Sequence, residues 1–296
     1  MTDKDSAASF QTMAICYDFD RTLTPVEMQA QGYIQELSAN PEDFWRQVNL
    51  MAREHQMDSN LAYMYMMLKG ATNRFRVTRD NLKTFGSRVV LYDGVESWFD
   101  RINAFALKHN ICVEHYILSS GILEMIEGTS IAGKFKRIYA NSFLYNDKGE
   151  AVWPAQNINY TNKTQFLFRI SKGILDVSDD RVNDYMHHSK MRIPFRNMVY
   201  IGDSMTDVPC MKLLSTYEGY AVGVYDPQKQ NKEQVTKLLT EQRIGYFAPA
   251  DYTESSPLFS LLEAIILEIE ARTALKARQA ECAAVACTFS DNSSYS

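Results

Sequence analysis

The sequence predicts an α/β fold in which a parallel sheet lies between two layers of helices, with an all-helical segment inserted after the first strand. From Val89 onward, apolar runs alternate with amphipathic runs, which is typical of βαβ units. One further apolar run, residues 13–16, precedes about sixty residues of helical pattern. The first strand therefore belongs to the later α/β unit, and the helical segment interrupts that unit.

The helical segment is predicted to span residues 25–87. Thr24, Pro25 and Glu27 form a capping box with proline at the first helical position, which predicts a helix from this point. Residues 60–70 have the apolar density of a buried helix. Similar start signals occur at Asn40 with Pro41, at Asp58 or Ser59, and at Thr78.

The α/β unit is predicted to comprise residues 1–24 and 88–280, arranged as a Rossmann-like three-layer core. A turn at 146–149 between two apolar runs predicts a hairpin over residues 143–153. The chain ends in the polar, serine-rich run "TFSDNSSYS". This run predicts a disordered tail over residues 281–296. The remaining strands are predicted at 111–118, 136–140, 197–202, 220–225 and 244–248, and the main flanking helices at 95–109 and 256–279.

Composition excludes several classes of protein. A hydrophobic content of 46% in 296 residues is enough for a large core, so the chain is globular. The net charge is −5 and no basic block is present, which argues against a nucleic-acid partner. No window approaches the roughly 18 apolar residues of a membrane span, and the polar start is unlike a secretory signal. We therefore expect a cytoplasmic protein without a membrane partner; the sequence does not indicate its oligomeric state.

Polar side chains stand where three of the predicted strands end. Asp18 and Asp20 follow the first strand, Ser119 follows strand 111–118, and Asp203 and Asp207 follow strand 197–202. In an open parallel sheet the ligand site lies at the carboxyl ends of the strands, so these side chains are expected to meet. The sequence thus predicts four aspartates and a hydroxyl at one edge.

Four carboxylates in one site require a compensating cation. Aspartate oxygens suit a hard ion such as Mg²⁺, which takes one or two carboxylates together with phosphate and water. A phosphate ligand would also need a lysine, and the run "YTNKTQFLFRISKG" offers Lys163 at a helix start or Lys172 further along. The backbone amides of Ser120 and Gly121 are expected to open a helix and offer a further anion site.

These motifs resemble those of the haloacid dehalogenase superfamily, specifically its phosphatases. "DFDRT" is similar to the first motif of that family, "YILSS" to the second, Lys163 to the third and "GDSMTD" to the fourth, in the family's order. A helical cap between the first and second motifs is a standard layout of the superfamily, and phosphoserine phosphatases are built this way. The resemblance covers nearly the whole chain except the tail.

The resemblance implies a magnesium-dependent phosphatase that acts on a small phosphorylated metabolite. Asp18 would be the nucleophile and Asp20 the general acid and base, with its pKa raised by burial or acidic neighbours. Asp18 and Asp203 would hold Mg²⁺ together with the backbone carbonyl of Asp20. Phosphate binding would fall to Ser119, Ser120 and Lys163, with Asp207 and Thr22 in supporting roles.

Three features of the sequence allow alternative interpretations. Glu27 occupies the position at which phosphoserine phosphatases read the substrate amine, yet the capping box with Thr24 explains it without any substrate, and this structural interpretation is favoured. Arg21 is either a surface or hinge contact or a residue that reads substrate. Residues 173–196 form a long connection that predicts an extra turn or helix outside the sheet, with no assigned purpose.

Two other functions are compatible with the same residues. A phosphotransferase would use the same aspartyl-phosphate but pass the phosphoryl group to an acceptor hydroxyl instead of water. A binding protein of the same fold would hold a phosphate ligand without turnover. Such a protein usually lacks a catalytic group, and every motif is present here.

Overall fold

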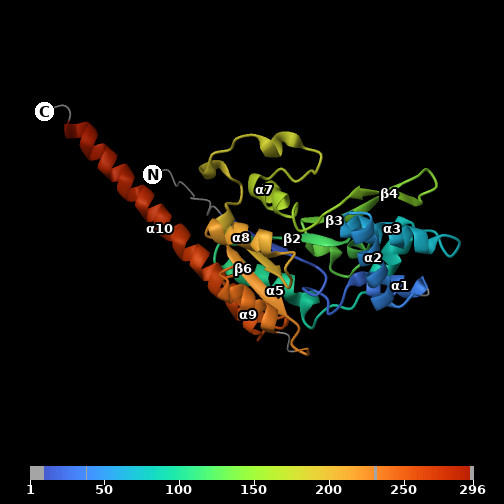
Figure 1. Ribbon diagram of the computed structural model, residues 1–296. Coiled ribbons are helices and arrows are strands. Elements are labelled where there is room, and N and C mark those ends of the chain that lie inside the picture. Colours follow the sequence, from blue (N-terminus) through green and yellow to red (C-terminus); the bar gives the residue numbers. More distant parts are fainter. Residues whose placement is uncertain (1–9, 38, 230–231, 294–296) are drawn as a thin grey trace.

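The centre of the molecule is a seven-stranded sheet with the strand order β4-β3-β2-β1-β5-β6-β7 (Figure 1). The computed structural model describes residues 10–37, 39–229 and 232–293. Neighbouring strands run parallel, except that β3 and β4 form an antiparallel hairpin. The strands are β1 (Gln11–Tyr17), β2 (Ile111–Ile122), β3 (Arg137–Tyr145), β4 (Ala151–Gln156), β5 (Met198–Gly202), β6 (Tyr220–Tyr225) and β7 (Tyr246–Pro249).

Strand β1 is buried on both faces because it lies in the middle of the sheet. Met13, Ile15 and Tyr17 pack on one face, and Ala14 and Cys16 pack on the other, as the period of a strand requires. The first face is covered by α5 (Val95–Lys108) and α10 (Pro257–Ser293), and the second by α7 (Thr164–Lys172), α8 (Val208–Thr216) and α9 (Lys232–Thr240). The predicted Rossmann-like three-layer αβα fold is confirmed.

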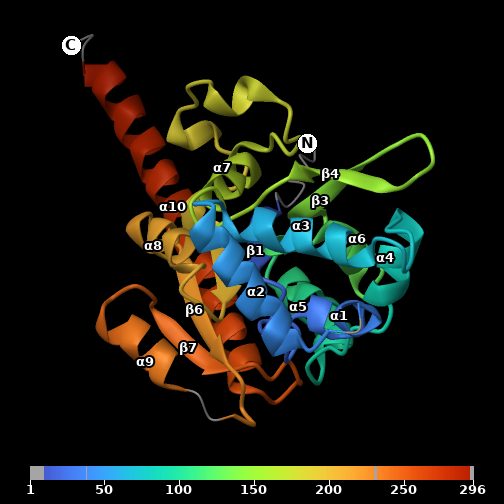
Figure 2. The ribbon, with the colours of Figure 1, turned by 45° about the vertical axis from the view of Figure 1, so that its right-hand side comes forward.

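The described residues between 28 and 86 form one 3-10 turn and four α-helices. Figure 2 shows α2 and α3 side by side in front of the sheet, and α4 beside α6. The elements are η1 (Met28–Ala30), α1 (Tyr33–Glu36), α2 (Pro41–Glu54), α3 (Ser59–Ala71) and α4 (Arg79–Gly86), followed in the sheet region by α6 (Leu123–Glu127) and η2 (Ala132–Lys134).

Three of the predicted helix starts are confirmed by side-chain caps. Asn40 accepts a hydrogen bond from the Glu42 amide at the start of α2. Asp58 caps α3, and Thr78 caps α4. Each cap satisfies amides that a helix leaves without an internal partner, which explains why these short polar residues define the boundaries.

The predicted capping box at Thr24, Pro25 and Glu27 is wrong, because no helix begins there. The Thr24 hydroxyl donates to the Val26 carbonyl at 2.8 Å, and Glu27 forms an ion pair with Arg21 instead of reaching back. The first α-helix of the segment begins only at Tyr33. The prediction fails because these polar groups find partners within the loop that follows β1.

The predicted disordered tail at 281–296 is also incorrect over the part that the structure describes. Helix α10 continues to Ser293 and projects beyond the sheet (Figure 1), whereas residues 294–296 lie outside the described residues. The run "AECAAVAC" is rich in alanine, which has the highest helix propensity, so the helix extends past its buried half. None of the helices in the described part of the chain has the length and hydrophobicity that a membrane span requires.

The connection at residues 173–196 packs outside α7 and contains short 3-10 turns, as predicted. These turns are η3 (Asp180–Asn183) and η4 (His188–Lys190), with η5 (Phe195–Asn197) leading into β5. Near its end, Arg192 binds Glu114 of β2, and Lys136 binds the same carboxylate. Glu114 also accepts a hydrogen bond from Tyr116 at 2.6 Å. This carboxylate therefore fixes the segment to the sheet.

Replacing Glu114 with glutamine should lower the free energy of unfolding by about 1 kcal/mol at neutral pH, because exposed ion pairs rarely contribute more. Although partial burial opposes it, bonding to Arg192 and Lys136 lowers the pKa of Glu114 from 4.5 to about 2. The stabilisation is thus complete above pH 4.5 and is lost as pH falls toward 2. Urea unfolding of both proteins across this range should show a difference that shrinks with acid. A difference independent of pH would contradict the assignment.

Candidate active site

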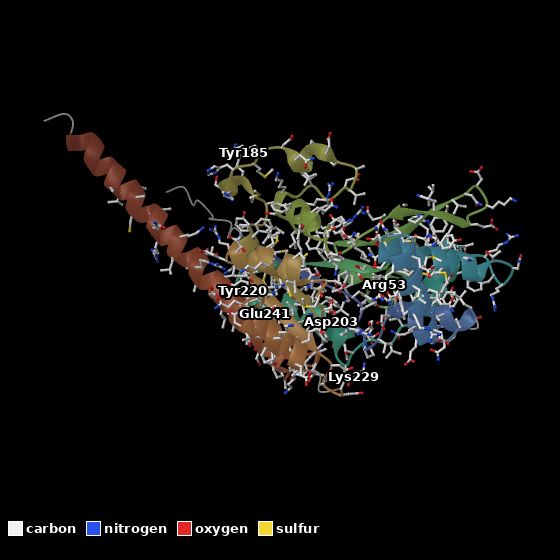
Figure 3. All side chains as sticks on the ribbon, in the orientation of Figure 1. Arg53, Tyr185, Asp203, Tyr220, Lys229 and Glu241 are labelled. Atoms are coloured by element: carbon white, nitrogen blue, oxygen red, sulfur yellow. The ribbon has the colours of Figure 1, made fainter. Side chains whose placement is uncertain are left out.

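A cavity of about 320 Å³ lies between the strand ends and helices α2 and α3. Asp18 directly follows β1, and its amide donates to the Ile201 carbonyl of β5 at 2.9 Å. Because β1 pairs in parallel with both β2 and β5, the ends of all three strands meet at one edge. Figure 3 labels Asp203 together with Arg53 of α2 and with Lys229, which lies in the loop that follows β6.

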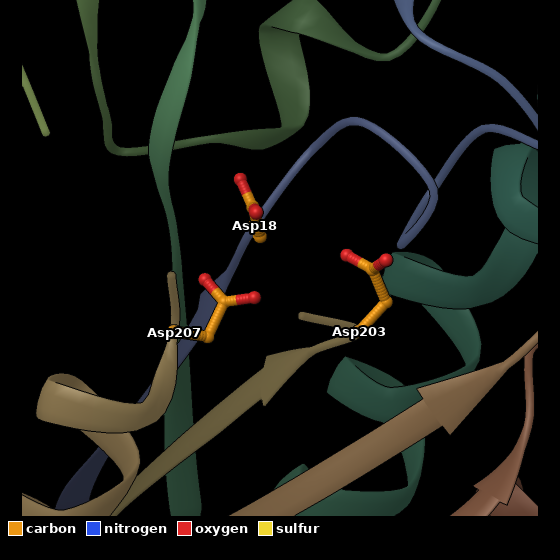
Figure 4. A group of neighbouring side chains, drawn as sticks. All are labelled: Asp18, Asp203 and Asp207. Carbon is orange, nitrogen blue, oxygen red and sulfur yellow. The ribbon is translucent and has the colours of Figure 1, made fainter. Parts of the chain in front are cut away.

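Three of the predicted aspartates come together at this edge. The carboxylates of Asp18, Asp203 and Asp207 each place one oxygen within 4.8 Å of the others (Figure 4). Asp18 and Asp207 are buried, and Asp203 is half-buried. Asp20 also lines the cavity, but its carboxylate lies outside this group and accepts the Met28 amide at 2.8 Å.

Lys163 is the cation of this cluster. Its ammonium lies 2.7 Å from an Asp207 oxygen and 3.2 Å from an Asp18 oxygen, and its side chain is fully buried. Burial alone would lower the pKa of Lys163, but the two carboxylates outweigh burial and raise it above its ordinary value. Lys172 instead donates to the Val182 and Asp184 carbonyls outside α7. Of the two candidate lysines, only Lys163 lies in the cluster.

Asp207 is held rigidly. Besides Lys163, its carboxylate accepts hydrogen bonds from the Tyr200 hydroxyl at 2.7 Å and from the Ser204 amide at 3.1 Å. Burial would raise the pKa of Asp207, but Lys163 and Tyr200 lower it below its usual range. Asp207 therefore ionises more readily than an ordinary aspartate, and its carboxylate positions Lys163.

The other carboxylates are destabilised as anions. Burial, followed by the Asp207 charge, raises the pKa of Asp18 to about 7, and the same causes raise the pKa of Asp203 well above its ordinary value. Burial is also the main cause that raises the pKa of Asp20, to about 8. Three clustered carboxylates face one ammonium, so this donor set fits a divalent cation, which would supply the missing positive charge.

The turn after β2 differs from the prediction. Strand β2 continues to Ile122, so Ser120 and Gly121 do not open a helix, and α6 begins only at Leu123. The Ser119 hydroxyl oxygen accepts the Gly121 amide at 2.9 Å, and no described residue accepts the hydroxyl proton, which can therefore donate to a ligand. The Ser120 hydroxyl donates to the Ile158 carbonyl at 2.8 Å. Both serines line the cavity, and Ser119 is almost fully buried.

Three further predicted residues lie in the loop that follows β1. The Thr22 hydroxyl donates to an Asp203 oxygen at 3.4 Å. Arg21 has a positive φ of 60° and places its guanidinium 2.5 Å from the Glu27 carboxylate. Arg21 and Glu27 both line the cavity, and each neutralises the other there.

Sequence reasoning missed several residues that shape the cavity. Asn141 is fully buried and donates to the Ser120 carbonyl and to the Tyr63 hydroxyl, both at 2.7 Å. Tyr63 donates to the same Ser120 carbonyl and lines the cavity together with Trp45. A polar residue inside the apolar strand run at Asn141 was the available signal. The roles of Trp45 and Tyr63 depend on how α2 and α3 pack against the sheet, which the sequence pattern does not specify.

The site geometry depends on the absence of a side chain at Gly202. A Cβ atom there would lie 2.6 Å from the Asp207 carboxyl carbon, which its hydrogen bonds hold in place. We expect Gly202→Ala to lower the free energy of unfolding by about 1–3 kcal/mol, as overpacking does. Gly133→Ala is the control, because a Cβ atom there meets nothing within 4 Å. Equal urea midpoints for the two variants would contradict the close approach.

The family model of the haloacid dehalogenase-like hydrolases matches residues 15–212. The chain belongs to this family. The match includes Asp18, Lys163 and Asp207, and it confirms the resemblance seen in the motifs. A protein of Borreliella burgdorferi that is described as uncharacterized is 28% identical to this hydrolase over 283 residues, covering 87% of this chain and 98% of that one.

Solved structures of the family share the fold of this haloacid dehalogenase-like hydrolase. A HAD family hydrolase from Salmonella enterica serovar Typhi has a TM-score of 0.55 at 15% identity and covers 85% of this chain and 70% of its own. A probable phosphoserine phosphatase from Vibrio cholerae has a TM-score of 0.55 at 9% identity, with coverages of 90% and 69%. An apo phosphoserine phosphatase has a TM-score of 0.51 at 13% identity, with coverages of 80% and 93%. At these identities the likeness concerns the fold alone.

Proposed function

We propose that this hydrolase is a magnesium-dependent phosphatase that removes phosphate from a small phosphomonoester through a phosphoryl group carried on Asp18. The observation that supports this most strongly is the buried Lys163, which lies between Asp18 and Asp207 beside a third carboxylate. Asp20, two residues after the nucleophile, adds a proton donor that dehalogenation does not need. This second acid favours phosphoryl transfer over the other chemistry of the family.

In the first step, an Asp18 oxygen would attack phosphorus while the bond from phosphorus to the leaving oxygen breaks. Asp20 would give its proton to that oxygen, so the product leaves as an alcohol. A pKa of about 8 lets Asp20 begin protonated at neutral pH. In the second step, water would lose a proton to Asp20 and attack phosphorus, the bond to Asp18 would break, and phosphate would leave.

The phosphoryl oxygens need donors that hold them in place. The Ser119 hydroxyl has a free proton, and the Lys163 ammonium is already fixed by Asp207, so both are preorganised. The Ser120 hydroxyl is committed to Ile158, which leaves its backbone amide as the donor from that residue. Thr22 would support Asp203 through its hydroxyl.

Asp18 and Asp203, with the backbone carbonyl of Asp20, would hold Mg²⁺. When bound, the ion would neutralise phosphate charge and offset the carboxylates that Lys163 alone cannot balance. We also propose that residues 25–87 act as a cap over a core made of 1–24 and 88–280. The cap contributes the α2 and α3 wall of the cavity, which would exclude water and contact the leaving group.

The purified protein should release phosphate from p-nitrophenyl phosphate and from at least one phosphorylated metabolite when Mg²⁺ is present. Chelation with EDTA should stop release, and added Mg²⁺ should restore it. Absence of release from a broad panel of phosphomonoesters would contradict the proposal. Transfer of the phosphoryl group to an added alcohol in preference to water would instead establish a phosphotransferase.

A further inference from the structure

The helical side of the cavity is polar but almost uncharged. It is lined by Gln29 of η1, by Trp45 and Asn49 of α2, and by Asn60 and Tyr63 of α3. Of the described residues that line the cavity, Arg21 is the cationic one, and Glu27 pairs with it at 2.5 Å. This wall therefore offers hydrogen bonds without a free positive charge.

Gln29 is the most informative residue of this wall. The residue is 2% exposed, and its Oε1 atom has no hydrogen-bond partner among the described residues. It follows Met28, whose amide binds the Asp20 carboxylate, so Gln29 lies beside the predicted proton donor. A buried acceptor without a partner is unfavourable, and a ligand hydroxyl that donates to it would remove the penalty.

Trp45 supplies the complementary group in the same wall. Its indole Nε1 is buried and, within the described residues, likewise has no acceptor. The ring packs edge-on against Tyr63, with ring centroids 5.7 Å apart, and this contact holds it at the cavity. Gln29 and Trp45 both line the cavity, and an unpaired acceptor on one with an unpaired donor on the other suits a ligand that carries several hydroxyl groups, since each hydroxyl both donates and accepts.

A phosphoamino acid fits this wall poorly. Its carboxylate would need a cation, but Arg21 is paired with Glu27, and Lys163 is buried between Asp18 and Asp207. Leaving a carboxylate unpaired in a partly buried site costs free energy.

We infer that the substrate of this site is a phosphorylated sugar or polyol, whose hydroxyl groups bind Gln29 and Trp45. The inference rests on the proposed phosphatase function and names its substrate class. It distinguishes this hydrolase from the phosphoserine phosphatases that share its fold. Gln29 and Trp45 select the leaving group, whereas Asp18, Asp20 and Lys163 act on the phosphoryl group.

The first test compares kcat/KM for sorbitol 6-phosphate, glucose 6-phosphate, glycerol phosphate, phosphoserine and p-nitrophenyl phosphate with Mg²⁺ present. At least one sugar or polyol phosphate should exceed phosphoserine by tenfold or more. If p-nitrophenyl phosphate is hydrolysed but phosphoserine is the best of the metabolites, the inference is wrong and the phosphatase function stands. If no compound is hydrolysed, both fail.

The second test changes the wall while measuring the ratio of kcat/KM for the best sugar or polyol phosphate to that for p-nitrophenyl phosphate. Gln29→Met conserves volume and removes the amide's acceptor oxygen and its NH₂ donor, so the ratio should fall roughly tenfold, the effect of one lost hydrogen bond. Gln47→Met is the control, because Gln47 is exposed on α2 away from the cavity. Trp45→Phe keeps an aromatic ring but removes the indole N–H donor. It tests the inference independently if the Gln29→Met protein does not fold. Unchanged ratios in both folded variants would overturn the inference.

A third variant reverses the expected selectivity. Glu27→Gln removes the negative charge that neutralises Arg21 in the cavity. Arg21 would then be free to bind a substrate carboxylate, so kcat/KM for phosphoserine should rise several-fold relative to the sugar or polyol phosphate. A ratio that stays at the parent value would show that the Arg21–Glu27 pair does not exclude carboxylates.

Discussion

Replacing Asp18 with asparagine is expected to lower phosphate release at least about 10⁴-fold, because loss of the nucleophile removes the covalent route. The protein should remain folded. In the absence of metal, burial and the Asp207 charge raise the pKa of Asp18 to about 7, so its ionised form is unfavourable in the folded state. Above pH 7 the neutral amide should therefore increase the free energy of unfolding, on the order of 1 kcal/mol.

Steady-state assays and urea unfolding at pH 8 without metal check the two parts of this prediction. Asp226→Asn is the matched control, since Asp226 lies at the end of β6 outside the cluster of three aspartates. It should leave turnover close to that of the parent protein. Retained turnover in Asp18→Asn would contradict the nucleophile, and a less stable Asp18→Asn protein would contradict the electrostatic account.

The second large effect is expected for Lys163→Met, which should lower both the rate of phosphate release and the free energy of unfolding. The substitution leaves the Asp18 and Asp207 carboxylates buried without their cation, and breaking a buried ion pair costs about 3–5 kcal/mol. Phosphate release should fall by a factor of about 10³, since the phosphoryl oxygens lose a charged donor. Urea unfolding and steady-state kinetics measure the two losses.

Lys172→Met provides the control on the same helix. Among the described residues its ammonium binds the Val182 and Asp184 carbonyls alone, so the expected loss is below about 1 kcal/mol with turnover within about twofold. Adding Asp207→Asn to Lys163→Met should recover part of the lost stability, because one unpaired buried charge disappears. Equal effects of the two lysine variants would refute the position of Lys163 in the cluster.

The site could be predicted from sequence where it depends on strand ends. Asp18, Ser119 and Asp203 each follow an apolar run, and parallel strands carry such residues to one edge regardless of loop details. The choice between Lys163 and Lys172 could not be predicted this way. Both lie on or next to α7, and the choice depends on which end of that helix faces the sheet edge.

Local patterns failed where a tertiary partner competed for the same group. Thr24 and Glu27 match the sequence pattern of a capping box, but both ends of the pattern are engaged elsewhere. Glu27 binds Arg21, and the Met28 amide next to it donates to Asp20. Gln29 and Trp45 carry no motif at all. The role that we infer for them rests on polar atoms that find no partner among the described residues once the helices have packed against the strand ends.

The phosphoryl group on Asp18 can be sought directly. Enzyme quenched in acid during turnover of p-nitrophenyl phosphate with Mg²⁺, then digested and analysed by mass spectrometry, should carry one phosphoryl group on the peptide that contains Asp18. The Asp18→Asn protein should carry none. Sustained phosphate release with no phosphorylated peptide, or with the group on another residue, would contradict the account of this site.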